Sequence, residues 1–234
     1  MFASITRLFA SAPLFSLLRW LWVFVRSLFV VDQRIIRVAA VGPSGSGKST
    51  LSSILSGGDG RVAPKTREVG YIPNRALSTE NLYIENIDTR GSDFALASSQ
   101  ERAISFETWQ KAIDTATSVV FMVSAEPLGE NQRAYDHAAI DDLDTVLRYM
   151  TYHKDPYVRD MRVAIIINKC DIADDGAKNH MMEVFRGYTS QDTIKTFLLS
   201  ANSPQMIWEN SRRQLIQFLQ PDDREFESAA IATG

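Results

Sequence analysis

The chain has 234 residues, of which 45% are hydrophobic and 23% charged, and its formal net charge is -3. A nucleic-acid-binding protein is expected to present a strongly basic face, so we expect no nucleic acid among the partners. Cys170 is the sole cysteine, so no disulfide can form within the chain, which suits a reducing compartment.

The N-terminal segment is predicted to be a hydrophobic helix. Residues 14–31 are apolar except for Ser16, Arg19, Arg26 and Ser27. Eighteen helical residues span about 27 Å, close to the hydrocarbon thickness of a bilayer. The apolar residues favour insertion, but the two arginines offset nearly all of that gain. The helix is therefore expected to lie in the interface, to snorkel its arginines, or to pack its polar stripe against a membrane partner. A buried soluble helix is the alternative.

The composition of this segment also resembles a targeting sequence. It contains several arginines and serines, no lysine, and Asp32 as its single acid, as mitochondrial presequences do. A secretory signal is the competing interpretation. We expect residues 1–34 to be retained as an anchor, with the mitochondrial inner membrane slightly favoured over the endoplasmic reticulum.

The next element is a phosphate-binding loop. Residues 42–49 read Gly-Pro-Ser-Gly-Ser-Gly-Lys-Ser, a complete G-x-x-x-x-G-K-[ST], between the apolar run 35–41 and a helix-like segment. Glycines let main-chain N–H groups surround a diphosphate, Lys48 bridges the outer phosphates, and the Ser49 hydroxyl can bind Mg2+. A glycine-rich turn without a ligand is the alternative. The predicted nucleotide-binding residues here are Ser44, Gly45, Ser46, Gly47, Lys48, Ser49 and Thr50.

The middle of the chain alternates strand-like and helix-like segments, which predicts an α/β fold. Residues 69–72 and 82–87 resemble a hairpin, and residues 119–123 a buried strand. Two apolar stripes at helical spacing are assigned to the core, and an acidic cluster is assigned to a solvated helix face. These sets are Phe106, Trp109, Ile113 and Ala116; Ile140, Leu143, Leu147 and Met150; and Asp141, Asp142 and Asp144.

Three further loops follow strand-like runs. They are Asp88-Thr89-Arg90-Gly91 after residues 82–87, Asn168-Lys169-Cys170-Asp171 after 163–167, and Ser200-Ala201-Asn202 after 197–199. Taken singly, the last two are plausible as a surface turn and a helix N-cap. Taken together with the phosphate loop, the four predict one site, because ligands of a doubly wound sheet gather at the carboxyl ends of its strands.

These motifs, in this order, resemble those of the P-loop small GTPases, the Ras/Arf-like G domains, over roughly residues 35–219. The resemblance implies a doubly wound, mostly parallel six-stranded sheet in a domain of residues 35–220, preceded by the N-terminal hydrophobic helix. A retained anchor before a G domain is also similar to the beta subunit of the signal recognition particle receptor. Residues 221–234 are expected to form an acidic, flexible tail.

The resemblance assigns roles around the phosphates. Thr66 stands where the family's switch threonine closes over the γ-phosphate and completes the Mg2+ shell. Asp88 would reach Mg2+ through water, and the Gly91 N–H would meet the γ-phosphate. The implied metal-binding residues are therefore Ser49, Thr66 and Asp88.

The resemblance also identifies the base as guanine. Asn168, Lys169 and Asp171 match N-K-x-D, in which the aspartate accepts two hydrogen bonds from guanine that adenine cannot offer. Asn168 would brace the loop, and the stem of Lys169 would pack along the base. Ser200, Ala201 and Asn202 resemble the S-A-K loop, with asparagine in place of lysine. The implied ligands are GTP or GDP with Mg2+.

One departure from the family concerns hydrolysis. Ser92 follows Asp-x-x-Gly where many members place the glutamine that orients the attacking water. Ser44 also stands where fast-cycling relatives often keep glycine. With Thr66, Gly91 and Ser92 as the catalytic set, we expect weak or absent intrinsic hydrolysis, so whether the chain acts as an enzyme stays open.

The sequence therefore favours a membrane-anchored guanine-nucleotide-binding protein with slow or partner-dependent hydrolysis, acting as a switch or receptor subunit. The alternative is a GTP-holding structural or accessory subunit of a larger complex, in which the nucleotide never cycles. An ATP-dependent enzyme ranks third. Expected partners are membrane lipid, a membrane protein, or both.

Overall fold

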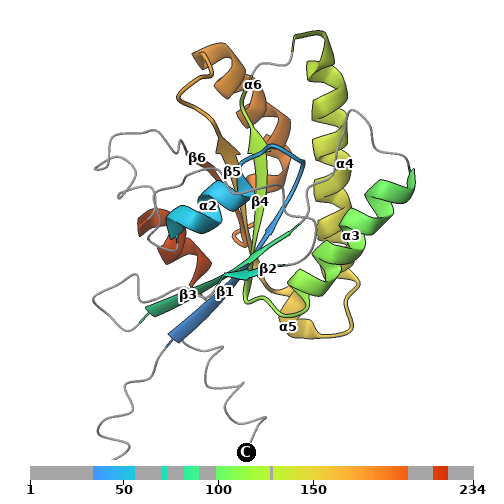
Figure 1. The fold of residues 1–234 in the computed structure, drawn as a ribbon, viewed down its shortest axis with the longest axis vertical. Helices are drawn as coiled ribbons and strands as arrows, with labels where there is room; N and C mark the ends of the chain where they lie inside the picture. The colour runs from blue at the N-terminus through green and yellow to red at the C-terminus, as the bar shows by residue number, and fades with distance from the viewer. Residues whose placement is uncertain are drawn as a thin grey trace, which may run out of the picture.

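A computed structural model describes residues 34–55, 70–72, 82–89, 99–126, 129–199 and 213–220. Within these ranges the chain is α/β, with a largely parallel sheet, as expected (Figure 1). The predicted hydrophobic helix before residue 34 and the acidic tail after residue 220 lie outside the described residues.

The centre of the fold is one six-stranded sheet in the order β2-β3-β1-β4-β5-β6. The β2-β3 pair is antiparallel, and the other pairs are parallel. The neighbouring interior strands β4 and β5 are almost wholly buried and rich in valine and isoleucine, as parallel strands covered on both faces require. The bounds are β1 Arg34–Val41, β2 Gly70–Ile72, β3 Leu82–Asp88, β4 Ser118–Ser124, β5 Arg162–Asn168 and β6 Ile194–Leu198.

Helices cover both faces of the sheet (Figure 1). One core unites alternate residues of the strands with α3 (Ser99–Ile113), α4 (Gln132–Thr151), α5 (Pro156–Arg159) and α6 (Asp175–Phe185). The other core holds Leu51 of α2 (Lys48–Leu55) and Leu215 and Leu219 of a helical segment at 213–219. Two short 3-10 helices, η1 (Gly129–Asn131) and η2 (Arg186–Ser190), complete the described elements.

The strand order creates a switch point beside β1. The chain leaves β1 through α2 toward β2 and β3, and returns from β3 through α3 to β4 on the other side of β1. Since α2 and α3 lie on opposite faces, the carboxyl end of β1 is left uncovered by either helix, as in other doubly wound sheets. The phosphate loop begins at this end.

Several element predictions hold, and one assignment is wrong. The hairpin of residues 69–72 and 82–87 is present as the antiparallel pair β2-β3. The acidic cluster is not uniformly solvated, because Asp142 is only 8% exposed. It lies one turn from Ala138 and Val146, which are both buried, so it belongs to the packed stripe of α4 despite its charge. Asp144 in turn accepts a hydrogen bond from the Tyr188 hydroxyl at 2.7 Å.

The predicted apolar stripes are partly shifted. Trp109 and Ile113 are fully buried, but α3 ends at Ile113, so Ala116 belongs to the turn before β4. On α4 the buried stripe includes Leu143 and Met150, whereas Ile140 is partly exposed. Among the described helices, none combines the length and apolar character that crossing a membrane would need.

Candidate nucleotide-binding site

The phosphate loop joins β1 to α2, and its glycines adopt conformations that other residues avoid. Gly42, Gly45 and Gly47 have φ values of 129°, 77° and 98°. A β-carbon on Gly42 would lie 2.3 Å from the main-chain oxygen of Met122 on β4. The loop can therefore take this path close to the sheet only because residue 42 has no side chain.

Lys48 is buried at the start of α2, with 5% of its surface exposed. Its ammonium donates hydrogen bonds to the main-chain oxygens of Gly42 at 3.0 Å and Pro43 at 2.8 Å, and to Ser46 Oγ at 3.5 Å. A buried ammonium is costly unless its protons are engaged, so the loop closes around it. The positive charge is thus held inside a ring of main chain, where it can attract a phosphate.

The other predicted residues of the loop differ in exposure. Ser46 is fully buried, Gly45 is exposed, and Ser44, Ser49 and Thr50 are partly exposed. Because α2 begins at Lys48, the loop precedes a helix N-terminus, whose first main-chain N–H groups have no partner within the helix and can bind a phosphate. These features fit a diphosphate.

The end of β3 lies directly beside the phosphate loop. Asp88 is the last residue of β3 and is in register with Ala40 on β1, two residues before Gly42. The next residue, Thr89, is 1% exposed and donates a hydrogen bond from Oγ1 to the Ala40 main-chain oxygen at 2.6 Å. This bond ties the Asp-x-x-Gly segment to β1. The backbone therefore places Asp88 at the edge where an Mg2+ bound by Ser49 would be expected.

Asn168 joins the base-recognition segment to the phosphate loop. Its side-chain Nδ2 donates to the Ser46 main-chain oxygen at 3.0 Å, and its own main-chain oxygen accepts from the Ala125 N–H at 2.8 Å. Asn168 is only 5% exposed, and buried polar groups are stable only when they are hydrogen-bonded, so these two bonds satisfy its side-chain amide and its main-chain oxygen. Two motifs separated by 122 positions thereby form one site.

Lys169 and Asp171 occupy the turn after β5. Lys169 has a φ of 62°, and its ammonium contacts Glu126 Oε2 at 2.5 Å. Asp171 is exposed to solvent. The turn is closed by a hydrogen bond from the Ile172 N–H to the Lys169 oxygen at 3.2 Å.

Cys170 faces inward between the two ligand-binding positions. Its Sγ donates to the Ile167 main-chain oxygen at 3.2 Å, and burial raises the pKa of the thiol. A raised pKa disfavours the thiolate, so Cys170 is a neutral spacer and not a nucleophile. Its main-chain N–H donates to the Leu199 oxygen at 3.3 Å. Leu199, where the described stretch after β6 ends, therefore lies beside this turn.

The remaining predicted site residues lie outside the described residues, and their roles stay predictions. They are Thr66, Gly91, Ser92, Ser200, Ala201 and Asn202.

Two residues of the site were not found from the sequence. Glu126, just after β4, forms an ion pair with Lys169. The main chain of Met122 lies so close to Gly42 that no side chain fits at that position. Neither belongs to a recognisable motif, because both act through the register of β4 with its neighbours. The sequence did hold one clue to Glu126: it closely follows an apolar strand-like run, as the other site loops do, which would place it at the carboxyl edge of the sheet.

Comparison with known proteins identifies the fold. No protein-family model matches the chain, and no curated protein matches it by sequence. Solved structures do match. Elongation factor SelB of Methanococcus maripaludis, in complex with the GTP analogue GppNHp, has a TM-score of 0.55 at 17% identity. Era in complex with MgGDPNP and a segment of 16S ribosomal RNA has 0.52 at 18%, and Aquifex aeolicus Era Y63A bound to GDP·AlF4- has 0.51 at 20%.

These matches cover most of this chain but only part of each neighbour. They span 80% of this chain and 34% of SelB, 82% and 59% for the RNA-bound Era, and 81% and 58% for Era Y63A. They do not test the likeness to the signal recognition particle receptor beta subunit, which stays a prediction. At these identities the likeness concerns the fold, and the fold of this chain is that of a P-loop GTPase G domain.

Proposed function

We propose that the chain is a guanine-nucleotide-binding protein that holds GTP or GDP across the carboxyl ends of β1 and β5. The observation that carries the proposal is the hydrogen bond from Asn168 to Ser46, which unites the phosphate loop with the N-K-x-D turn. The ligands named in the neighbouring structures, GppNHp, MgGDPNP and GDP·AlF4-, support guanine as the base. Mg2+ would be held by Ser49 with Asp88 and Thr66.

Asp171 is the residue proposed to select the base. Its carboxylate can accept two hydrogen bonds from guanine N1 and N2, whereas adenine would leave it without donors. A carboxylate deprived of its hydrogen bonds costs several kcal/mol, on the order of a hundredfold or more in affinity. The steep discrimination makes the assignment testable with one substitution.

The test is the Asp171→Asn variant, with GTP, XTP and ATP titrated into the full chain. We expect weaker GTP binding by roughly a hundredfold and a gain in XTP binding, because asparagine donates where xanthine accepts. Asp192→Asn, at an exposed position after η2, is the matched control and should bind GTP normally. Unchanged guanine preference in Asp171→Asn would remove this residue from the site.

Hydrolysis is proposed to be slow. Ser92 is too short to orient the attacking water as glutamine does, and a side chain at Ser44 crowds any arginine that a partner supplies. The full chain should therefore turn over GTP far more slowly than a typical enzyme at about 10 per second. Rapid single-turnover hydrolysis by the purified protein would contradict this.

A second function, a GTP-holding structural subunit, is favoured by the same substitution at position 92 and by the arginine-bearing N-terminal segment. The two functions differ in which nucleotide the protein carries. Gentle extraction followed by chromatography should release GTP from a permanent holder and GDP from a cycling switch or receptor subunit. ATP in the extract would refute both.

Residues 14–31 are proposed to attach the protein to a membrane, with the mitochondrial inner membrane slightly favoured and the G domain in a reducing compartment. The sequence of this segment supports membrane contact, as its apolar length matches a bilayer while its arginines weaken insertion. A membrane protein partner would then cover the polar stripe. Flotation of the full chain with lipid vesicles tests attachment, and Arg19→Leu together with Arg26→Leu should strengthen it.

A further inference from the structure

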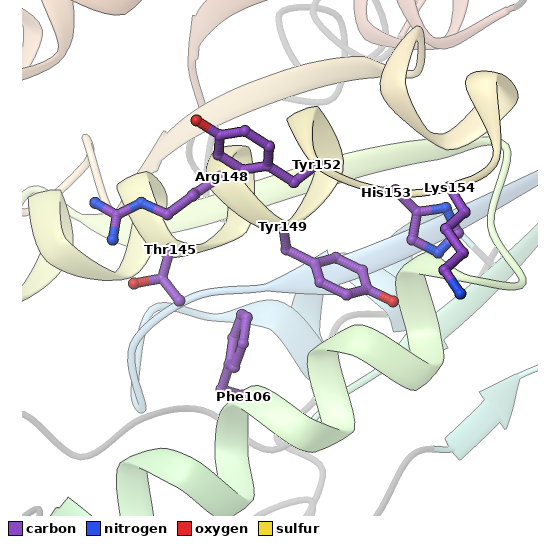
Figure 2. Close-up of a pocket in the computed structure, with 7 residues that line it drawn as sticks. All are labelled: Phe106, Thr145, Arg148, Tyr149, Tyr152, His153 and Lys154. Atoms are coloured by element: carbon purple, nitrogen blue, oxygen red, sulfur yellow. The ribbon is translucent and has the colours of Figure 1, made fainter.

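A groove of about 570 Å³ lies between α3 and α4, on the face of the sheet opposite α2 (Figure 2). Its lining comes from α3, from the last two turns of α4, and from the three residues that follow α4. The lining residues are Phe106, Thr145, Arg148, Tyr149, Tyr152, His153 and Lys154. None of them takes part in the nucleotide site, so the groove is a separate feature of the molecule.

The floor of the groove is a preformed aromatic surface. The Phe106 and Tyr149 rings meet edge to face with centroids 6.0 Å apart, and the Tyr149 and His153 rings are 5.3 Å apart. The Tyr149 hydroxyl donates to Asp114 Oδ1, and His153 Nε2 lies 3.3 Å from the same oxygen. The polar groups of the floor are thus already satisfied, and the surface left for a ligand is aromatic.

The rim of the groove is cationic. Arg148 and Lys154 are exposed and flank the aromatic floor on either side in Figure 2, and Tyr152 is 81% exposed beside them. Within the described part of the chain, neither cation forms a salt bridge, and Asp114 is engaged by its own two partners. The surface therefore matches a segment that carries several carboxylates and one aromatic side chain.

The sequence directly after the described fold has this composition. Residues 221–227 read Pro-Asp-Asp-Arg-Glu-Phe-Glu, with four acids and a single aromatic, Phe226. The charge and the aromatic residue are therefore complementary to the groove.

The exit of the chain lies within reach of the groove. Ser118 Oγ donates to the Leu219 oxygen at 2.7 Å, and Arg162 donates to the Gln220 oxygen at 2.7 Å, so the described chain ends beside the first residues of β4 and β5. Ser118 is four residues from Asp114, at most about 14 Å of chain, and Asp114 contacts His153 in the groove. Seven extended residues span up to about 23 Å, so residues 221–227 can reach it.

We propose that residues 221–227 bind in the groove between α3 and α4 of the same molecule, with Phe226 against Tyr149 and the acids beside Arg148 and Lys154. The docked segment would occupy the surface as a tethered ligand at high effective concentration and would exclude a partner of similar chemistry. The proposal does not depend on which nucleotide the protein holds.

Photo-cross-linking in the full chain tests the proposal, with p-benzoylphenylalanine placed at position 226. Cross-links are expected within the chain to the groove, around Phe106, Tyr149 and Tyr152. Charge reversal by Arg148→Glu with Lys154→Glu should lower the yield of these cross-links about five- to tenfold. Added salt should also lower the yield in the protein that keeps Arg148 and Lys154. Arg133→Glu, an exposed arginine in the first turn of α4, is the matched control and should leave the yield unchanged.

Two controls keep the outcome unambiguous. All variants should give the circular dichroism spectrum of the parent, which shows that they are folded, because the substituted charged residues are exposed. Mixing isotopically light and heavy chains distinguishes links within one molecule from links between two. Cross-links between molecules, links mapped outside the groove, or a yield that Arg148→Glu with Lys154→Glu leaves unchanged would each overturn the proposal. None of these outcomes bears on guanine binding.

Discussion

Asn168 and Ser46 are joined by a hydrogen bond of 3.0 Å from the side-chain amide to the main-chain oxygen, although the two residues lie in loops at the ends of different strands. The residue between Ser46 and α2, Gly47, leaves the space for this amide. A β-carbon at position 47 would lie 2.3 Å from Asn168 Nδ2. The shape of the phosphate loop and the position of the base-binding turn are therefore set by one contact.

Removing the amide should weaken nucleotide binding more than it weakens the fold. In Asn168→Ala the Ser46 oxygen loses its donor, which costs about 1–2 kcal/mol and corresponds to roughly 5- to 30-fold weaker GTP binding. Titration with a fluorescent GTP analogue measures this. Asn179→Ala, exposed on α6, is the matched control and should bind as the parent does. Equal affinities for both variants would show that the contact does not organise the site.

Adding a methyl group at position 47 should do greater harm. Gly47→Ala combines an unfavourable φ of 98° with displacement of the Asn168 amide, together about 2–3 kcal/mol or a roughly 30- to 150-fold loss of GTP affinity. Gly45→Ala isolates the first effect, because its φ is 77° and its β-carbon would meet nothing within 4 Å. Gly187→Ala, with open space and no positive φ, should bind GTP normally. A Gly45→Ala defect as large as that of Gly47→Ala would rule out the steric explanation.

The sequence predicted the α/β class and the carboxyl edge of the sheet as the site because loop motifs follow buried strands in a regular order. It could not predict contacts that depend on register. Glu126 lies opposite Lys169 only because β4 and β5 pair with Ser124 beside Asn168. The burial of Asp142 was also not predicted, because the residue was assigned to the solvated face from its charge and not from its position one turn from Ala138 and Val146. The periodicity of apolar residues predicts helices and strands, but which residues each face contacts depends on how these elements pack together.

The ion pair between Glu126 and Lys169 should orient the lysine more than it stabilises the protein. Both side chains are about a third to nearly a half exposed, at 44% and 32%, so the pair contributes less than about 1 kcal/mol to folding. Glu126→Gln should nevertheless weaken GTP binding about two- to fivefold, because the lysine stem loses its anchor beside the base. Glu183→Gln, which breaks an exposed pair with Arg186, is the control.

A double-mutant cycle makes this role specific. Lys169→Met keeps the aliphatic stem and removes the charge, so Glu126→Gln should have no further effect on GTP affinity in that background. Additive losses in the double variant would mean that Glu126 acts on the nucleotide by another route. Denaturant unfolding of the same proteins separates any change in stability from the change in affinity.

Tyr135 should make the fold sensitive to alkaline pH. Its hydroxyl accepts a hydrogen bond from the Ser124 N–H at 2.8 Å, and burial raises its pKa from 10.0 to about 12. Since the folded pKa lies above the unfolded one, this contribution to stability is complete below pH 10 and is lost as the pH rises from 10 to 12, by up to about 3 kcal/mol. Denaturant unfolding followed by circular dichroism between pH 8 and 11.5, roughly the span over which tyrosine titrates, measures this loss.

The Tyr135→Phe variant separates this titration from those of other groups. It should be less stable at neutral pH by about 1–3 kcal/mol, because the buried Ser124 N–H loses its acceptor, yet its stability should fall less steeply above pH 10. Tyr152→Phe, at a tyrosine that is 81% exposed, should keep the slope of the parent. Parallel pH profiles for the parent and Tyr135→Phe would mean that this hydroxyl keeps an ordinary pKa in the folded protein, and that the alkaline loss arises from Tyr149 and Tyr188, whose pKa values burial also raises.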